Sequence, residues 1–82
     1  MVDNAQQCRR CLIANDSEAL LYIVTSSLSK HFDEVKKCFN GSQAVDIVTK
    51  LPANYYNVII LDIDMPIMNG KEACRLILDY FG

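Results

Sequence analysis

The chain has 82 residues, which is the size of one domain and leaves no room for a second module. Apolar residues make up 51% and charged residues 22%, a balance that excludes an intrinsically disordered chain and predicts a globular fold. The formal net charge of -2 is spread without a long run of either sign, so neither nucleic acid nor a membrane is an expected partner.

Residues 1–9 are expected to form a polar N-terminal extension that precedes the domain. They contain no apolar stretch of the length found in signal peptides, and the chain has no run of about 18 apolar residues. We therefore expect a cytoplasmic protein.

The four cysteines are expected to be reduced thiols, since nothing marks the chain for secretion. They are Cys8, Cys11, Cys38 and Cys74. Cys8 and Cys11 form a single Cys-x-x-Cys pair, and the sole histidine, His31, falls at the end of a predicted helix, so a tetrahedral zinc site lacks ligands. Cys11, Cys38 and Cys74 are expected to be small core residues.

Three strand-like segments alternate with three segments of helical apolar spacing. In chain order, the strands are expected at 11–14, 35–39 and 58–61, and the helices at 17–32, 44–51 and 73–80. The second strand carries Lys36 and Lys37 and is expected at an edge of the sheet. Val58–Leu61 has no polar alternation, which is typical of a central parallel strand covered on both faces.

This alternation predicts right-handed crossovers and a parallel sheet with helices on both faces. Ligands of such sheets bind beyond the carboxyl ends of the strands, which is where Asn15, Asp16 and Asp62 fall. If the first and third strands are neighbours, two carboxylates meet there, and their repulsion is relieved by a cation such as Mg²⁺. Asp62 could then attack a phosphoryl group.

A simpler interpretation exists for each aspartate alone. Asp16 is of a type that more often caps a helix than binds a metal, and Asp62 is of a type that often serves in turns. The joint arrangement at the ends of neighbouring strands favours the functional interpretation.

The segment Val58–Gly70, which reads VIILDIDMPIMNG, resembles the phosphoacceptor segment of the receiver domains of two-component response regulators and hybrid histidine kinases. The resemblance implies that Asp62 is the phosphoacceptor and that the main-chain carbonyl of Asp64 binds the metal. The residues that shape the loop fall on Met65, Pro66 and Gly70.

Upstream, Leu12–Ser17 is similar to the first strand of this family and its acidic pair. The resemblance implies that Asp16 is a direct metal ligand together with Asp62. Asn15 takes the second position of the acidic pocket, where the family has a carboxylate. One negative charge is lost there, which should weaken the binding of Mg²⁺.

The resemblance implies a flavodoxin-like, three-layer α/β/α fold, with strand order 2-1-3 and residues 10–82 as a partial receiver domain. The implied function is that of a response regulator in a phosphorelay: a histidine kinase or histidine phosphotransfer protein passes its phosphoryl group to Asp62 with Mg²⁺ as cofactor, which yields an aspartyl phosphate. Such a domain modifies itself and is not an enzyme acting on an independent substrate.

The resemblance covers about two-thirds of a receiver, and the chain ends before the strands that carry the family's Thr/Ser and Lys. We therefore expect either a missing C-terminal half or self-association through the exposed third strand. One alternative is a truncated or degenerate receiver that acts only as a protein-interaction module. Another is a Mg²⁺-dependent phosphohydrolase, which the Asp62-x-Asp64 spacing favours and the lack of further Lys and Asp ligands opposes.

Overall fold

The computed structural model describes residues 8–82. Residues 1–7, most of the expected extension 1–9, lie outside the described residues, and the boundary between extension and domain stays a prediction. The elements are β1 (Arg10–Ala14), α1 (Glu18–Leu28), β2 (Glu34–Cys38), α2 (Gly41–Thr49), β3 (Val58–Leu61) and α3 (Gly70–Phe81). Their alternation confirms the predicted order.

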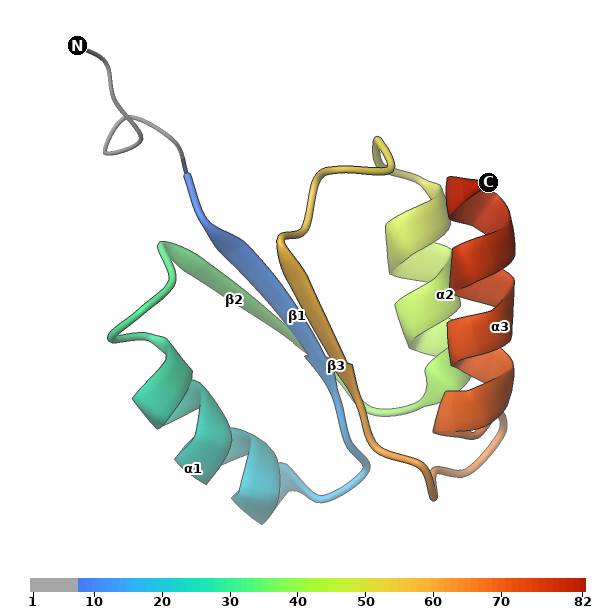
Figure 1. The fold of residues 1–82 in the computed structure, drawn as a ribbon. Coiled ribbons are helices and arrows are strands. Elements are labelled where there is room, and N and C mark those ends of the chain that lie inside the picture. The colour runs from blue at the N-terminus through green and yellow to red at the C-terminus, as the bar shows by residue number, and fades with distance from the viewer. Residues whose placement is uncertain (1–7) are drawn as a thin grey trace, which may run out of the picture.

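The strands form one parallel sheet in the order β2-β1-β3, as predicted (Figure 1). β1 lies in the middle, and its residue Ile13 is paired with Lys37 of β2 and with Ile60 of β3. Cys11–Ala14 are all buried, because β1 has a strand on each side and helices on both faces. The lysine-bearing β2 lies at an edge, as predicted.

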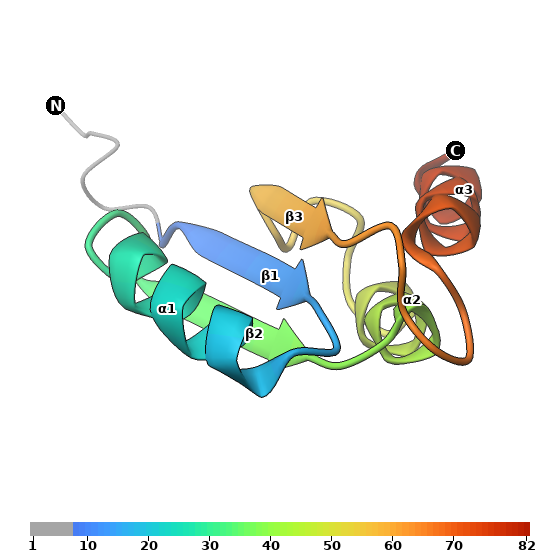
Figure 2. The same cartoon turned by 90° about the horizontal axis from the view of Figure 1, so that it is seen from below.

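The helices make two further layers, with α1 on one face of the sheet and α2 and α3 on the other (Figure 2). The main apolar cluster fills the α2 and α3 side, where Leu12 and Ala14 of β1 meet Ala44 and Val48 of α2 and Ile77 of α3. This is the three-layer, flavodoxin-like α/β/α arrangement. No helix within residues 8–82 has the length and apolar character needed to cross a membrane.

Each helix begins at a polar capping residue, Ser17, Asn40 or Asn69. The side-chain oxygen of each cap accepts a hydrogen bond from the backbone N–H three residues later, at 3.3, 2.8 and 2.9 Å respectively. The simpler interpretation of Asp16 as a helix cap is therefore wrong, because Ser17 holds that position.

Several element boundaries differ from those expected. α1 ends at Leu28 and not near residue 32, because the chain tightens into a turn in which the N–H groups of Lys30 and His31 donate to the carbonyls of Ser27 and Leu28, at 3.2 and 2.9 Å. His31 lies in that turn. β2 is shifted by one residue, and α2 and α3 each start three residues early because Asn40 and Asn69 cap them. α2 also ends at Thr49, two residues before the expected end.

Two expectations about burial are wrong within the described residues. β3 lies at the second edge of the sheet, and Val58 and Ile60 are 40% and 37% exposed because no described strand covers its outer side. Cys74 is also exposed, since it faces the space beside this edge. Cys11 and Cys38 are buried as expected, and burial raises the pKa of the Cys38 thiol to about 11.

Candidate functional site

The ends of β1 and β3 are held side by side by backbone hydrogen bonds. Ala14 is paired with Leu61 in the sheet, and the N–H of Asp62 donates to the carbonyl of Ala14 at 3.1 Å. On the other side, the N–H of Asn15 donates to the carbonyl of Cys38 at 3.1 Å. The sheet therefore brings Asn15 and Asp62 to one edge, the one formed by the carboxyl ends of the strands. Asp16 follows Asn15 in the chain.

The carboxylates at this edge have no basic partner within residues 8–82. Asp16 is exposed and Asp62 is half-buried. The ion pairs of the described residues use the carboxylates of Glu34, Asp46, Glu72 and Asp79. Two anionic groups without a counterion at adjacent strand ends favour a bound cation. In the described part of the chain, no three His, Cys, Asp or Glu side chains gather into a fuller metal site.

Asn15 shapes the turn that leads from β1 into α1. Its side-chain oxygen accepts a hydrogen bond from the N–H of Ser17 at 2.9 Å, which forms an Asx turn. Asn15 is half-buried and neutral. The residues that directly follow β1 and β3 therefore contribute two carboxylate side chains, those of Asp16 and Asp62.

Two glycines fix the loop between β3 and α3. The N–H of Gly70 donates to the carbonyl of Ile63 at 2.9 Å, and a Cβ at Gly70 would lie only 2.1 Å from the carbonyl oxygen of Asp62. The N–H of Gly41 likewise donates to the carbonyl of Met68 at 2.9 Å, and a Cβ there would lie 2.4 Å from the same Met68 oxygen. The backbone of Asp62 is therefore held by close contacts that only glycine permits.

The loop residues have different environments. Met65 is buried in the apolar cluster, whereas Pro66 and Asp64 are exposed. The main-chain carbonyl of Asp64 accepts no backbone hydrogen bond from residues 8–82, so it is free to bind a ligand. Ile67 has a φ of 69° and is 83% exposed, an unusual backbone conformation for a β-branched residue. The turn at Pro66 thus carries local strain.

Sequence reasoning missed three residues of this region. Gly41 anchors the loop from the neighbouring helix, Asn69 caps α3, and Ile67 takes the strained conformation. A signal for the first two was present, because α2 and α3 both begin with Asn-Gly, at 40–41 and 69–70. The positive φ of Ile67 could not be predicted from the sequence, since isoleucine rarely adopts a positive φ.

The chain matches the family model of the response regulator receiver domain over residues 11–80. Among curated relatives, it is 30% identical over 77 residues to the signal transduction histidine-protein kinase BarA of Escherichia coli. The aligned segment covers 94% of this chain and 8% of that protein. It is 36% identical over 66 residues to protein PilH of Pseudomonas aeruginosa, which covers 80% of this chain and 52% of that protein.

A solved structure shares the fold. The receiver domain of the histidine kinase CKI1 from Arabidopsis thaliana, complexed with Mg²⁺ and BeF₃⁻, superposes with a TM-score of 0.82 at 28% identity. The match covers 88% of this chain and 56% of that one, so the chain spans little more than half of that solved domain. Both the sequence pattern and the strand order agree with these relatives, and the chain belongs to the family of response regulator receiver domains.

Proposed function

We propose that this receiver domain accepts a phosphoryl group on Asp62 from a phosphohistidine of a histidine kinase or phosphotransfer protein. The observation that carries the proposal is the pairing of β1 with β3, in which the N–H of Asp62 donates to Ala14. This pairing puts a half-buried carboxylate without a basic partner in residues 8–82 at the same sheet edge as Asp16. The identity of the relative BarA as a histidine-protein kinase supports a partner of that class.

The donor atoms at this edge fit Mg²⁺. The side chains of Asp16 and Asp62 and the main-chain carbonyl of Asp64 offer three oxygens, and Mg²⁺ prefers a small oxygen set completed by water and phosphate. Mg²⁺ supplies charge neutralisation when bound, which lets an anionic phosphoryl donor approach an anionic carboxylate. The CKI1 receiver was crystallised with Mg²⁺ and BeF₃⁻, which is consistent with this chemistry in a relative.

The chain itself contributes the nucleophile and its positioning. A carboxylate oxygen of Asp62 forms the new P–O bond as the P–N bond of the phosphohistidine breaks, and the imidazole nitrogen keeps the electron pair. Ala14 and Gly70 hold the main chain of Asp62 on its two sides, through a hydrogen bond to Ala14 and through close contact with Gly70. A nucleophile held in this way needs little rearrangement to attack.

A second candidate is a receiver that serves only as an interaction module and is not phosphorylated. The observation in its favour is Asn15, whose amide oxygen is engaged by Ser17 and which lacks the charge of a carboxylate. This candidate predicts that Asp62 takes no phosphoryl group.

Titration of the isotope-labelled chain with Mg²⁺ by NMR tests the metal site on which the first candidate depends. We expect amide shifts centred on Asp16, Asp62 and Asp64 at millimolar Mg²⁺. Asp16→Asn should remove these shifts, because it removes one of two carboxylates. Asp64→Asn is the matched control and should retain them, because it leaves the main-chain carbonyl in place. Equal loss in both variants, or no shifts in the folded parent, would contradict the proposed site.

A further inference from the structure

The outer edge of β2 carries backbone groups that no described strand pairs. The carbonyl of Cys38 points toward β1, where it accepts the N–H of Asn15. Because backbone groups alternate in direction along a strand, those of Val35 and Lys37 point away from β1. In the described part of the chain the sheet ends at β2 on this side, so these two residues present their N–H and C=O groups outward.

The unpaired charges of β2 are basic. Glu34, at the start of the strand, forms an ion pair with Arg10 at 3.4 Å. Lys36 and Lys37 are exposed and take part in no ion pair within residues 8–82. Their side chains stand on opposite faces of the sheet, because neighbouring residues of a strand alternate. The strand therefore presents one uncompensated ammonium group on each face, beside its open backbone edge.

A pocket lies on each face of this edge. On the α2 side, a pocket of about 290 Å³ is lined by Lys36, Phe39 and Ile47 among others. On the α1 side, a pocket of about 330 Å³ is lined by Lys37, Phe39 and Tyr22 among others. An extended segment that pairs with β2 would place alternate side chains in these two pockets.

The carboxylates beside these pockets are already stabilised by the chain. Asp46 lines the α2-side pocket and forms an ion pair with Lys50 of the same helix. Glu18 lines the α1-side pocket from the first turn of α1, where the helix dipole favours an anion. The edge therefore keeps the basic character that Lys36 and Lys37 give it.

We propose that the outer edge of β2 binds an extended acidic segment of a partner protein, which adds to the sheet as a further strand. Its backbone pairs with Val35 and Lys37, and its carboxylates lie opposite Lys36 and Lys37 and neutralise both ammonium groups. Apolar side chains next to these carboxylates pack beside Phe39, which is 42% exposed. The proposal does not depend on phosphorylation of Asp62.

A second copy of this chain fits the edge less well. In an antiparallel pair of β2 strands across a twofold axis normal to the sheet, the strands lie about 4.8 Å apart. Each α1 packs on its own β2, on the same face of the joined sheet (Figure 2). Packed helices need about 8–10 Å between their axes, so the two α1 helices would collide. An isolated extended segment brings no such helix.

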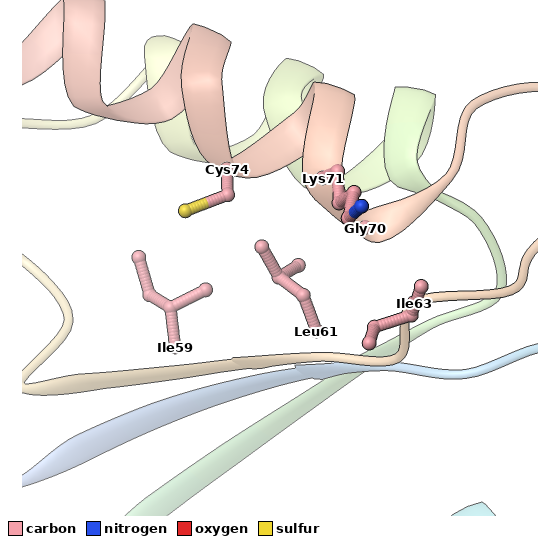
Figure 3. A pocket seen from close by; sticks show the side chains of 6 residues that line it. All are labelled: Ile59, Leu61, Ile63, Gly70, Lys71 and Cys74. Atoms are coloured by element: carbon pink, nitrogen blue, oxygen red, sulfur yellow. The ribbon is translucent and has the colours of Figure 1, made fainter.

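The other edge of the described sheet lacks this charge pattern. The side chains of β3 are all apolar, and Figure 3 shows Ile59 and Leu61 pointing toward Cys74 on α3. An acidic segment therefore gains no ion pair with that strand. The backbone groups of Ile59 and Leu61 also point away from β1, because the N–H of Asp62 points toward it. Their amides serve as an internal reference.

Amide hydrogen exchange followed by NMR reports occupancy of the β2 edge. The probe is the capped peptide TVEEVIT, added to the full 82-residue chain. At saturating peptide we expect exchange at Val35 and Lys37 to slow about tenfold, because their outward N–H groups gain hydrogen bonds. Exchange at Lys36, whose N–H points toward β1, and at the reference amides of Ile59 and Leu61 should stay unchanged.

Exchange of charge provides the matched test. The double variant Lys36→Glu, Lys37→Glu should raise the dissociation constant of TVEEVIT about tenfold or more, because two attractive cross-strand pairs become repulsive. The same variant should bind the capped peptide TVKKVIT more tightly than the parent does, which also shows that the variant is folded. Lys30→Glu changes an exposed lysine in the turn before β2 and should leave the affinity for both peptides unchanged.

Three results would overturn the proposal. The first is a parent chain whose Val35 and Lys37 amides are not slowed at millimolar TVEEVIT, or that binds TVEEVIT and TVKKVIT equally well. The second is equal slowing at Ile59 and Leu61, which would mean strand addition without selection by charge. The third is slowing that rises with chain concentration without peptide, which would assign the edge to a second copy. The parent's preference between the two peptides decides the matter if the double variant does not fold.

Discussion

Replacing Gly70 with alanine tests how the loop holds Asp62. Gly70 is the first residue of α3, where alanine would by itself stabilise the helix by about 0.5–1 kcal/mol. The new Cβ would, however, lie 2.1 Å from the Asp62 carbonyl oxygen and 2.8 Å from its carbon. The first distance is more than about 1 Å short of ordinary contact, and both neighbours are backbone atoms that cannot rotate away.

Overpacking of this kind typically costs about 1–3 kcal/mol. Because the clashing atoms belong to the backbone, we take the upper part of this range, about 2–3 kcal/mol, and subtract a helix gain of about 1 kcal/mol. We therefore expect Gly70→Ala to destabilise the chain by about 1–2 kcal/mol. With a urea slope of about 1 kcal/mol per M for a chain of this size, the midpoint should fall by about 1–2 M. The measurement is urea unfolding of residues 1–82 followed by far-UV circular dichroism.

Gly82→Ala is the control, because a Cβ at Gly82, just after α3, would have no heavy atom within 4 Å beyond its chain neighbours and the backbone of the helix. Its φ of 89° adds backbone strain, but the last residue is free to relax, so we expect a much smaller change. A Gly70→Ala chain that is as stable as the parent, or more stable, would refute the close-contact argument and leave helix propensity as the dominant effect.

Three further predictions concern a cap, a thiol and the metal site. Asn40→Ala removes the cap of α2 and should lower the free energy of unfolding by about 1 kcal/mol in urea titration, whereas the exposed Asn54→Ala should not. The raised pKa of Cys38 means that its contribution to stability is complete below pH 9, its ordinary pKa, and is lost as pH rises toward 11. Urea midpoints at pH 8 and 10 should differ less in Cys38→Ala than in the parent. Asn15→Asp adds a carboxylate and should lower the Mg²⁺ dissociation constant measured by NMR.

The topology of this fold could be predicted because its signals are local. The strands end where polar turn residues follow apolar runs, and Lys36 and Lys37 mark β2 as an edge strand. The α1 boundary could not be predicted from apolar spacing, because Phe32 continues that spacing beyond the turn at residues 29–31. The exposure of Cys74 could not be predicted either, since it depends on which strands flank β3.

The candidate site was predictable only in part. The sequence motif points to Asp16, Asp62 and the loop residues, and the backbone pairing at Ala14 brings the two strand ends together. The Asn-Gly pair at 40–41 marks Gly41, but the partner of Gly41 in the loop, Met68, is distant in the chain, so the contact itself could not be predicted from a local pattern. The roles of Asp16, Asp62 and Asp64 in binding and chemistry stay predictions.

The most direct test of phosphorylation is to locate an acyl phosphate on the chain. Residues 1–82 are incubated with Mg²⁺ and a small phosphodonor such as acetyl phosphate, and the product is mapped by mass spectrometry and checked for cleavage by hydroxylamine. We expect one hydroxylamine-sensitive phosphoryl group on Asp62, retained in Asp64→Asn and absent in Asp62→Asn. Labelling that survives Asp62→Asn, or a folded Mg²⁺-bound chain that takes no label, would contradict the assignment of Asp62 as the phosphoacceptor.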